Sequence, residues 1–283
     1  MKNYSALCNV PPPLPRESIC SWLSRTSLSQ GVSITAMLEF LELKLHFDFD
    51  FRFWRLDIDS IAKKVNLLAS DFRNQRTISR SLRMYDFCAK FYVMRYGRKR
   101  RSRFCPLCLQ EDEIPYFRME WRLKLCVSCP IHKCLLEDDC NHCRSPIILP
   151  VNLFAKASDE RPLESLANCP SCGTQLSKVS PAFFQGVLYE AMDKKSKYFI
   201  ETSELVVAAF YKRNVWFNKK IQGLEPLFYK QARSRKKEFK WTARTWRLKI
   251  KRHLKSHPMI RDVNPPLEPN YFLDIGRSVR QLK

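Results

Sequence analysis

Four short pairs of cysteine or histidine residues, each with two residues between its members, occur in order along the middle of the chain. Cysteine thiolates and imidazoles bind zinc in tetrahedral sets of four, and this spacing lets both members of a pair reach one ion. The first two pairs would supply three cysteines and one histidine, and the last two would supply four cysteines. The spacing therefore predicts two structural Zn²⁺ ions per chain, held by Cys105, Cys108, Cys129, His132, Cys140, Cys143, Cys169 and Cys172.

The fourth ligand of the first site has two interpretations on spacing alone. Cys126 and Cys129 are also separated by two residues, and 17 residues lie between Cys108 and Cys126, which is a normal gap for a zinc ribbon. Cys126 could therefore replace His132, and Cys134 is spare in either case. The remaining cysteines are expected to be buried apolar residues rather than ligands; they are Cys8, Cys20 and Cys88.

Each set of four provides only protein ligands and leaves no open position for water. Closed zinc sites are structural, whereas catalytic zinc keeps a vacant position. No G-x-S-x-G, H-E-x-x-H or G-x-x-x-x-G-K-[ST] motif occurs in the chain. A metal nuclease built on His132, Asn141 and His142 is less favoured, because His132 is a candidate ligand and His142 lies inside a pair. We therefore expect a protein that is not an enzyme.

The formal net charge of +22 is distributed unevenly. Residues 1–104 carry 19 Lys and Arg against 9 Asp and Glu, residues 105–180 carry 8 against 10, and residues 181–283 carry 23 against 9. An excess of this size indicates a polyanionic partner such as DNA or RNA. No stretch approaches the roughly 20 apolar residues that span a bilayer, and the first 15 residues do not resemble a secretory signal. The expected location is the bacterial cytoplasm, on DNA and away from membranes.

Hydrophobic periodicity predicts a mostly α-helical chain with small zinc-ribbon modules. We expect three regions: an N-terminal helical region (1–100), a double zinc-finger module (101–180) and a basic helical C-terminal region (181–283). Helical spacing marks Ile19–Thr26 and Ile34–Leu41, with Gly31 placed to end the first helix and Ser33 to cap the second. This pair is helix-turn-helix-like. Leu41–Phe53 alternates as a strand would, in conflict with the end of the second helix. Helical spacing returns over Ile58–Ala69, with Asp57 or Asp59 as its cap, and over residues 71–94.

Two basic segments are candidates for nucleic-acid contact. One lies directly before the first cysteine pair, and the other is a helical stretch in the basic C-terminal region, with its apolar face at Trp246, Ile250 and Leu254. Arginine forks grip phosphate oxygens without reading sequence. The candidate contacts are Arg98, Lys99, Arg100, Arg101, Arg103, Arg244, Arg247, Lys251 and Lys255.

The residues around the pairs resemble the TniQ family, which includes the TnsD-type target selectors of transposons. The resemblance rests on Cys105-Pro-Leu-Cys108 followed by leucine, Pro115-Tyr-Phe-Arg118 followed by Trp121, Cys129-Pro-Ile-His132, and Cys140-Asn-His-Cys143. At the N-terminus, Pro15-Arg-Glu-Ser18 and Ser21-Trp-Leu-Ser-Arg25 are similar to the opening helix of the family. The resemblance covers about residues 10–185.

The resemblance implies that His132, rather than Cys126, completes the first site. It also implies an adaptor in DNA transposition, which bridges target-site recognition to a AAA+ ATPase regulator of the transposase. Recognition would come from its own DNA binding or from a CRISPR-RNA effector complex, and some relatives form homodimers. The alternative from another class is a free-standing, zinc-dependent, DNA-binding transcription regulator.

Two surfaces are candidates for docking the ATPase. The first is the acidic run Glu111, Asp112 and Glu113, where charge reversal is expected to leave the fold intact. The second is the opening helix with Trp22 and Arg25, since tryptophan and arginine are frequent interface hot spots when exposed. The place of Trp22 in an apolar stripe favours the core over the interface.

Overall fold

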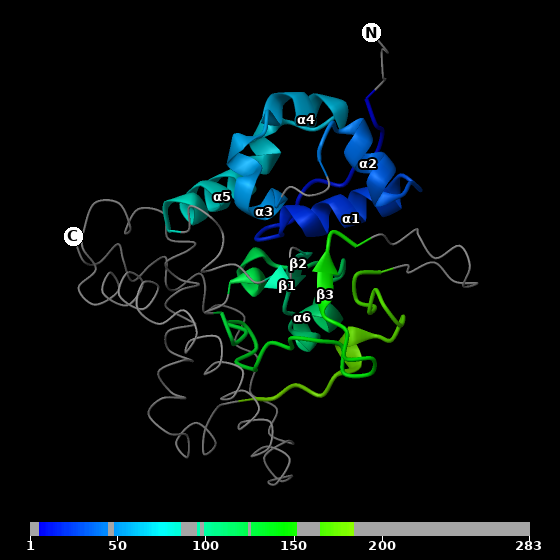
Figure 1. Cartoon of the computed structure of the whole chain (residues 1–283), viewed down its shortest axis with the longest axis vertical. Helices are drawn as coiled ribbons and strands as arrows, with labels where there is room; N and C mark the ends of the chain where they lie inside the picture. The colour runs from blue at the N-terminus through cyan, green and yellow to red at the C-terminus, as the bar shows by residue number, and fades with distance from the viewer. Residues whose placement is uncertain are drawn as a thin grey trace, which may run out of the picture.

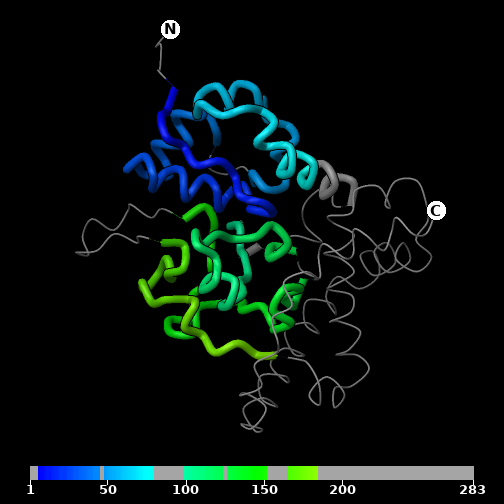
Figure 2. Tube along the Cα trace, turned by 180° about the vertical axis from the view of Figure 1, so that it is seen from behind, coloured from blue at the N-terminus to red at the C-terminus, as the bar shows by residue number. Residues whose placement is uncertain are grey.

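The computed structural model of the chain describes residues 6–44, 48–85, 95–96, 99–123, 126–151 and 165–183. These residues form two lobes that lie against each other (Figure 1; seen from behind in Figure 2). Three sets of predictions lie outside these ranges. They are the nucleic-acid contact at Arg98, the buried position of Cys88 and the basic helical C-terminal region.

The first lobe is helical and runs from blue to cyan in Figure 1. Its elements follow one another in chain order with short connections. They are α1 (Ile19–Ser29), α2 (Ile34–Phe40), α3 (Phe49–Arg52), the 3-10 turn η1 (Phe53–Arg55), α4 (Ile58–Lys64), η2 (Ala69–Phe72) and α5 (Arg73–Tyr85).

The second lobe is small in regular structure and holds the cysteine pairs. Its sheet has the strand order β1-β2-β3, with both pairings antiparallel and Arg101 opposite Ile148. The elements are β1 (Arg95–Tyr96), β2 (Lys99–Ser102), α6 (Pro106–Glu111), η3 (Met119–Arg122), β3 (Ile147–Leu149) and η4 (Leu176–Lys178). None of the described helices in either lobe combines the length and the apolar character that crossing a bilayer requires.

Local capping explains where the first two helices begin and end. The Ser18 hydroxyl accepts a hydrogen bond from the Ser21 N–H, and the Ser33 hydroxyl accepts one from Ala36 N–H, so each helix has a side-chain N-cap. Gly31 follows α1 with φ of +62°, a conformation that costs glycine little. The predicted roles of Gly31 and Ser33 are confirmed. The structure shows a helical pair joined by a turn, and it does not show that the pair reads DNA.

The alternating segment Leu41–Phe53 was expected to show strand character, and among its described residues it forms α3 and η1 instead. Phe49, Phe51 and Phe53 are all buried, because α3 packs against both α1 and α5. The polar Asp50 between them is buried too. The alternation therefore reflects burial on several sides of a short helix, which local periodicity does not distinguish from a strand. Further along, Asp57 caps α4 as predicted, accepting from Ser60 N–H at 3.2 Å.

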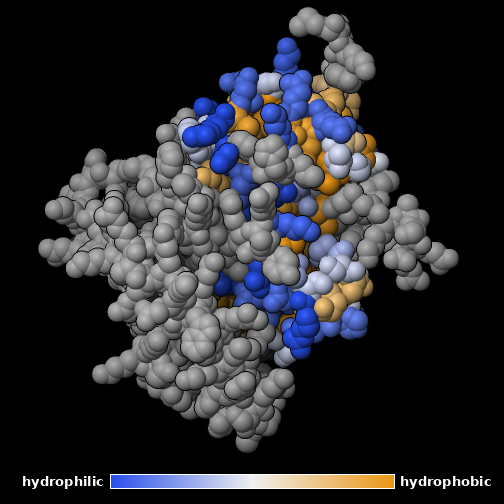
Figure 3. Space-filling view, in the orientation of Figure 1, coloured by the Kyte–Doolittle hydropathy of each residue, from blue (hydrophilic) through white to orange (hydrophobic). Residues whose placement is uncertain are grey.

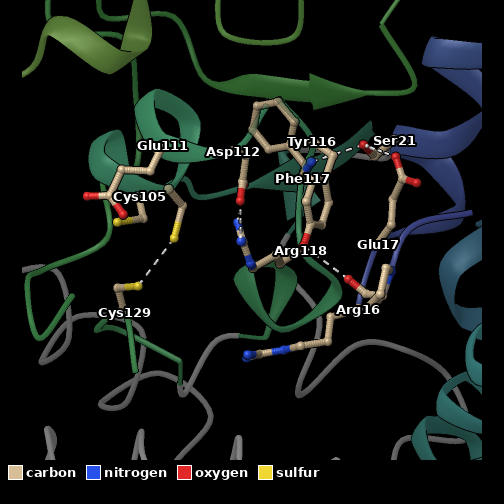
Figure 4. A network of polar contacts seen from close by, with 12 residues as sticks. Arg16, Glu17, Ser21, Cys105, Glu111, Asp112, Tyr116, Phe117, Arg118 and Cys129 are labelled. Carbon is tan, nitrogen blue, oxygen red and sulfur yellow. Dashed lines mark hydrogen bonds and ion pairs between the residues drawn. The ribbon is translucent and has the colours of Figure 1, made fainter. Parts of the chain in front are cut away.

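The two lobes share one hydrophobic core, which runs through the expected boundary at residue 100. Backbone hydrogen bonds join them: Ser18 N–H donates to Phe117 O at 2.9 Å, and Met119 N–H donates to Arg16 O at 2.8 Å. The Ser21 hydroxyl accepts from Phe117 N–H at 3.0 Å (Figure 4). The residues of the second lobe that carry the cysteine pairs are therefore held against α1.

Candidate metal centres

The first group of ligand atoms forms where α6 meets the turn at residues 129–132. Cys105 is the N-cap of α6 with Pro106 in its first turn, an arrangement that pre-sets the helix start, and Cys108 follows on the helix. The ligand atoms of Cys105, Cys108, Cys129 and His132 all lie within 4.8 Å of one another, and all four residues are buried.

The distances within this group fit one tetrahedral ion. Four ligands around zinc, with sulfur at about 2.3 Å, would place two sulfurs about 3.8 Å apart and a sulfur and a nitrogen about 3.6 Å apart. The Sγ atoms of Cys108 and Cys129 are 3.6 Å apart. His132 Nδ1 lies 3.2 Å from Cys108 Sγ and 3.6 Å from Cys129 Sγ. The donor set can therefore hold a metal ion without a change of backbone.

The structure places His132, and not Cys126, among the ligand atoms. The Cys126 thiol instead donates to the Ser128 carbonyl at 3.6 Å. Cys134 Sγ lies 3.6 Å from Cys105 Sγ, but Cys134 falls outside the group of four. The geometry thus favours the ligand set that the motif resemblance implied.

Glu111 has a role that sequence reasoning missed. Its Oε2 atom lies 2.7 Å from His132 Nε2, whereas the other ring nitrogen, Nδ1, is the one beside the sulfurs. A carboxylate in this position fixes the tautomer and orientation of a metal-binding imidazole. Its position three residues after Cys108, about one helical turn further along α6, was the sequence feature that could have indicated this role.

Burial and neighbouring groups set the charge of the first group in the absence of metal. Burial raises the pKa of the Cys105 and Cys108 thiols well above the usual value. Burial also acts to raise the pKa of Cys129, but hydrogen bonds from Cys105, Cys108 and His132 outweigh it and lower that pKa well below the usual value. One thiolate is thus favoured by the protein alone, and a cation is required to hold three.

The second group consists of Cys140, Cys143, Cys169 and Cys172, whose sulfurs also lie within 4.8 Å of one another. The Cys140–Cys172 and Cys143–Cys169 sulfur pairs are each 3.7 Å apart, close to the tetrahedral edge of about 3.8 Å. This group is nearer the surface than the first, since Cys143 and Cys172 are partly exposed. Burial acts to raise the pKa of Cys172, but hydrogen bonding with Thr174 outweighs it and lowers that pKa to about 5.

Three of the four pairs close with the same backbone turn. The residue directly after the second ligand has a positive φ in each: Lys133 at 50°, Arg144 at 60° and Gly173 at 74°. This conformation turns the chain so that the N–H of that residue donates to the carbonyl of the first ligand, as Lys133 does to Cys129 O at 3.0 Å. The remaining pair, Cys105 and Cys108, is held by α6 instead.

A third cluster, Cys20 with Asp48 and Asp50, already holds a protein cation, Arg122. The Arg122 guanidinium donates to Asp48 at 2.7 Å and 3.0 Å and to Asp50 at 2.5 Å. All four residues are buried. The cluster is therefore an ion-pair clamp between η3 and the start of α3.

Three arginines before the first pair have partners within the protein. Arg101 pairs with Asp139 at 2.8 Å, and Arg103 pairs with Asp138 at 2.8 Å. Arg103 also donates to the Leu123 and Cys126 carbonyls and is buried, while Arg100 donates to Leu149 O at 2.6 Å. The fold thus gives these three residues structural contacts, and their expected phosphate contact stays a prediction.

The other nucleic-acid candidates divide in two. Lys99 is exposed on β2 and stays available for such a contact. The rest lie outside the described residues: Arg98, Arg244, Arg247, Lys251 and Lys255.

The docking surface expected on α1 is corrected. Trp22 is 1% exposed and donates from Nε1 to Pro11 O at 2.8 Å, so it belongs to the core. Arg25 is buried and pairs with Glu17 at 2.6 Å. Neither side chain is open to a partner.

The acidic run keeps only one member free for docking. Asp112 accepts two hydrogen bonds from Arg118, at 2.8 Å and 2.9 Å (Figure 4). Glu111 contacts His132. Reversing these two charges would disturb the fold, contrary to expectation. Glu113 is exposed, as are Ile114 and Ile131.

The described part of the chain is thus a helical lobe fused to a lobe with two closed, four-ligand metal groups, a design typical of structural metal modules. The TniQ family model matches residues 9–136, which supports the membership of the TniQ family that the motifs led us to expect. The match includes the whole first metal group and both sides of the interface between the lobes. The match indicates a transposition-associated protein. No curated protein matches the chain.

Proposed function

We propose that this protein is a non-catalytic adaptor in DNA transposition, which holds one structural Zn²⁺ in each metal group. It bridges target-site recognition to a AAA+ ATPase regulator of the transposase. The observation that carries the proposal is the TniQ match over residues 9–136, which coincides with the core that joins the two lobes. Four protein ligands in each group leave no position for catalytic water.

Zinc is supported by the chemistry of the donors. Sets rich in thiolate select zinc over magnesium, calcium or manganese. Metal analysis of the purified protein should find about two equivalents of zinc, and Cys140→Ser should reduce this to about one. Protein that is folded and free of metal would contradict the assignment.

The ATPase is proposed to dock beside the first metal group. Glu113, Ile114 and Ile131 are exposed there: Ile131 adjoins His132, and Ile114 follows Glu111 by three residues. Exposed apolar residues next to an acidic side chain suit a protein partner better than a phosphate backbone.

This docking is tested with purified ATPase of the same transposon in a pull-down. Glu113→Lys combined with Ile131→Ser should reduce recruitment while zinc content and DNA binding persist. Glu39→Lys, an equivalent change at an exposed site on α2, is the control. Full recruitment by the double variant would move the docking surface elsewhere.

DNA binding is proposed to reside mainly in the C-terminal third, on the ground of its 23 Lys and Arg against 9 Asp and Glu. Replacing Arg244, Arg247, Lys251 and Lys255 with glutamine should weaken binding. It should also lower the log–log salt slope by about 0.9 for each phosphate that the protein no longer neutralises. An unchanged slope would place the phosphate contacts in another region.

Whether targeting is direct or guided by a CRISPR-RNA complex is addressed by one experiment. Tagged protein is purified from its native host, and the accompanying proteins and RNA are identified. Recovery of the transposition ATPase supports the adaptor. Recovery of RNA polymerase subunits without the ATPase would favour a transcription regulator.

A further inference from the structure

Helix α5 carries a row of arginines along one side. Arg73, Arg76, Arg80 and Arg83 lie in this helix, which contains no acidic residue between Arg73 and Tyr85. At about 100° of rotation per residue, their positions fall within an arc of about 80°. The sequence pattern alone places them on one face once the helix is established.

Other positions of α5 anchor it to the first lobe. Ile78 and Ser79 are buried, and the Ser79 hydroxyl donates to Phe51 O at 3.0 Å and accepts from Trp54 N–H at 3.1 Å. Gln75 is buried and donates to Leu14 O at 3.1 Å. These anchors fix the rotation of the helix about its axis, and the arginine positions lie on a different arc of it.

Arg76 differs from the ion-paired arginines elsewhere in the described residues. Six buried or half-buried arginines have carboxylate partners, in the pairs Arg16–Glu120, Arg25–Glu17, Arg101–Asp139, Arg103–Asp138, Arg118–Asp112 and Arg122–Asp48. Arg76 is half-buried and forms no ion pair among the described residues. Together with the lack of acidic residues in α5, this favours a source of negative charge from outside the lobe.

The segment packed along α5 also carries exposed arginines. Arg52 and Arg55, in α3 and η1, are exposed, as is Arg73 at the start of α5. The Arg55 guanidinium lies 4.8 Å from the ring centroid of the half-exposed Trp54. Figure 3 shows strongly hydrophilic residues gathered over the helical lobe on the face it draws. Exposed arginines therefore occur on three elements of the lobe, α3, η1 and α5.

We propose that the arginine face of α5 is a second DNA-contacting surface, which binds the phosphate backbone of duplex DNA without reading its sequence. The row from Arg73 to Arg83 is about 15 Å long, a distance over which one strand of duplex DNA passes about four phosphates. The four positions lie about 4.5, 6 and 4.5 Å apart along the helix, so they present a line of positive charge to a phosphate backbone. This inference goes beyond the proposed function. It rests on the proposed function only for the choice of DNA as the polyanion.

The surface is tested by two full-length variants that remove the same net charge. The first combines Arg73→Gln, Arg76→Gln and Arg80→Gln, and glutamine preserves helix propensity. The control combines Lys44→Gln, Lys63→Gln and Lys178→Gln, which are exposed in other parts of the described chain. Circular dichroism and zinc content verify that both variants are folded. Binding to a short random duplex is measured by fluorescence anisotropy between about 50 and 200 mM salt.

The log–log salt slope of the arginine variant should fall by up to about 2.7, at about 0.9 per phosphate, and that of the control should fall much less. Equal decreases would overturn the proposal, because they would report net charge alone, and so would an unchanged slope in the arginine variant. A larger decrease on single-stranded RNA than on the duplex would overturn the choice of duplex DNA. None of these outcomes bears on ATPase recruitment, which tests the proposed function separately.

Discussion

At the scale of single residues, His132 completes the first metal group through Nδ1, while Cys126 is used elsewhere. His132→Ala should therefore lower the zinc content by about one equivalent. Cys126→Ser should leave the zinc content unchanged, since its thiol contacts a backbone carbonyl. Metal analysis of both purified variants decides between them, and zinc loss in the cysteine variant alone would reverse the ligand assignment.

Glu111 is a positioning residue for the same histidine. Removing its charge with Glu111→Gln should weaken zinc binding at the first group by roughly 10- to 100-fold, the range found for such outer carboxylates. Competition with a chromogenic chelator measures this effect, and the exposed Glu113→Gln is the matched control. Equal zinc affinity in the two variants would show that the 2.7 Å contact does not support the metal.

At the scale of elements, the clamp between η3 and the start of α3 holds the lobes together. Arg122 is completely buried with Asp48 and Asp50, so Arg122→Ala would leave two buried carboxylates without their cation. We expect a loss of about 3–5 kcal/mol in the free energy of unfolding, measured by urea denaturation.

The exposed Lys63→Ala should change the same free energy by less than about 0.5 kcal/mol. Adding Asp48→Asn and Asp50→Asn to Arg122→Ala should recover part of the loss, because the uncompensated charges are removed. If instead the triple variant loses as much free energy of unfolding as the three single substitutions added together, the uncompensated charge is not the cause of the loss.

At the scale of the whole molecule, the shared core makes the lobes cooperative. Phe117 and Trp121 of the second lobe are buried in the core that α1 also enters. Loss of helical circular dichroism and release of zinc from the first group should therefore coincide during thermal unfolding. The Cys140→Ser variant isolates the first group for this measurement, with zinc release followed by an indicator dye. Helix loss well before zinc release would show that the lobes unfold independently.

Features set by near neighbours in the chain could be predicted from the sequence. The spacing of the cysteine pairs, the caps at Ser33 and Asp57, and the turn at Gly31 all depend on a few consecutive residues. The motifs around the first pairs were specific enough to predict the TniQ family, and the match over residues 9–136 supports this prediction. Charge distribution also needs no fold, since it is a property of composition along the chain.

The tertiary structure alone decided which charged and aromatic residues face solvent. Arg101 and Arg103 pair with Asp139 and Asp138, which approach from a distant segment, whereas Arg76 of α5 meets no such carboxylate among the described residues. In the same way, contact with His132 gives Glu111 its role. A run of sequence cannot show these partners, because burial and pairing depend on which segments the folded core brings together.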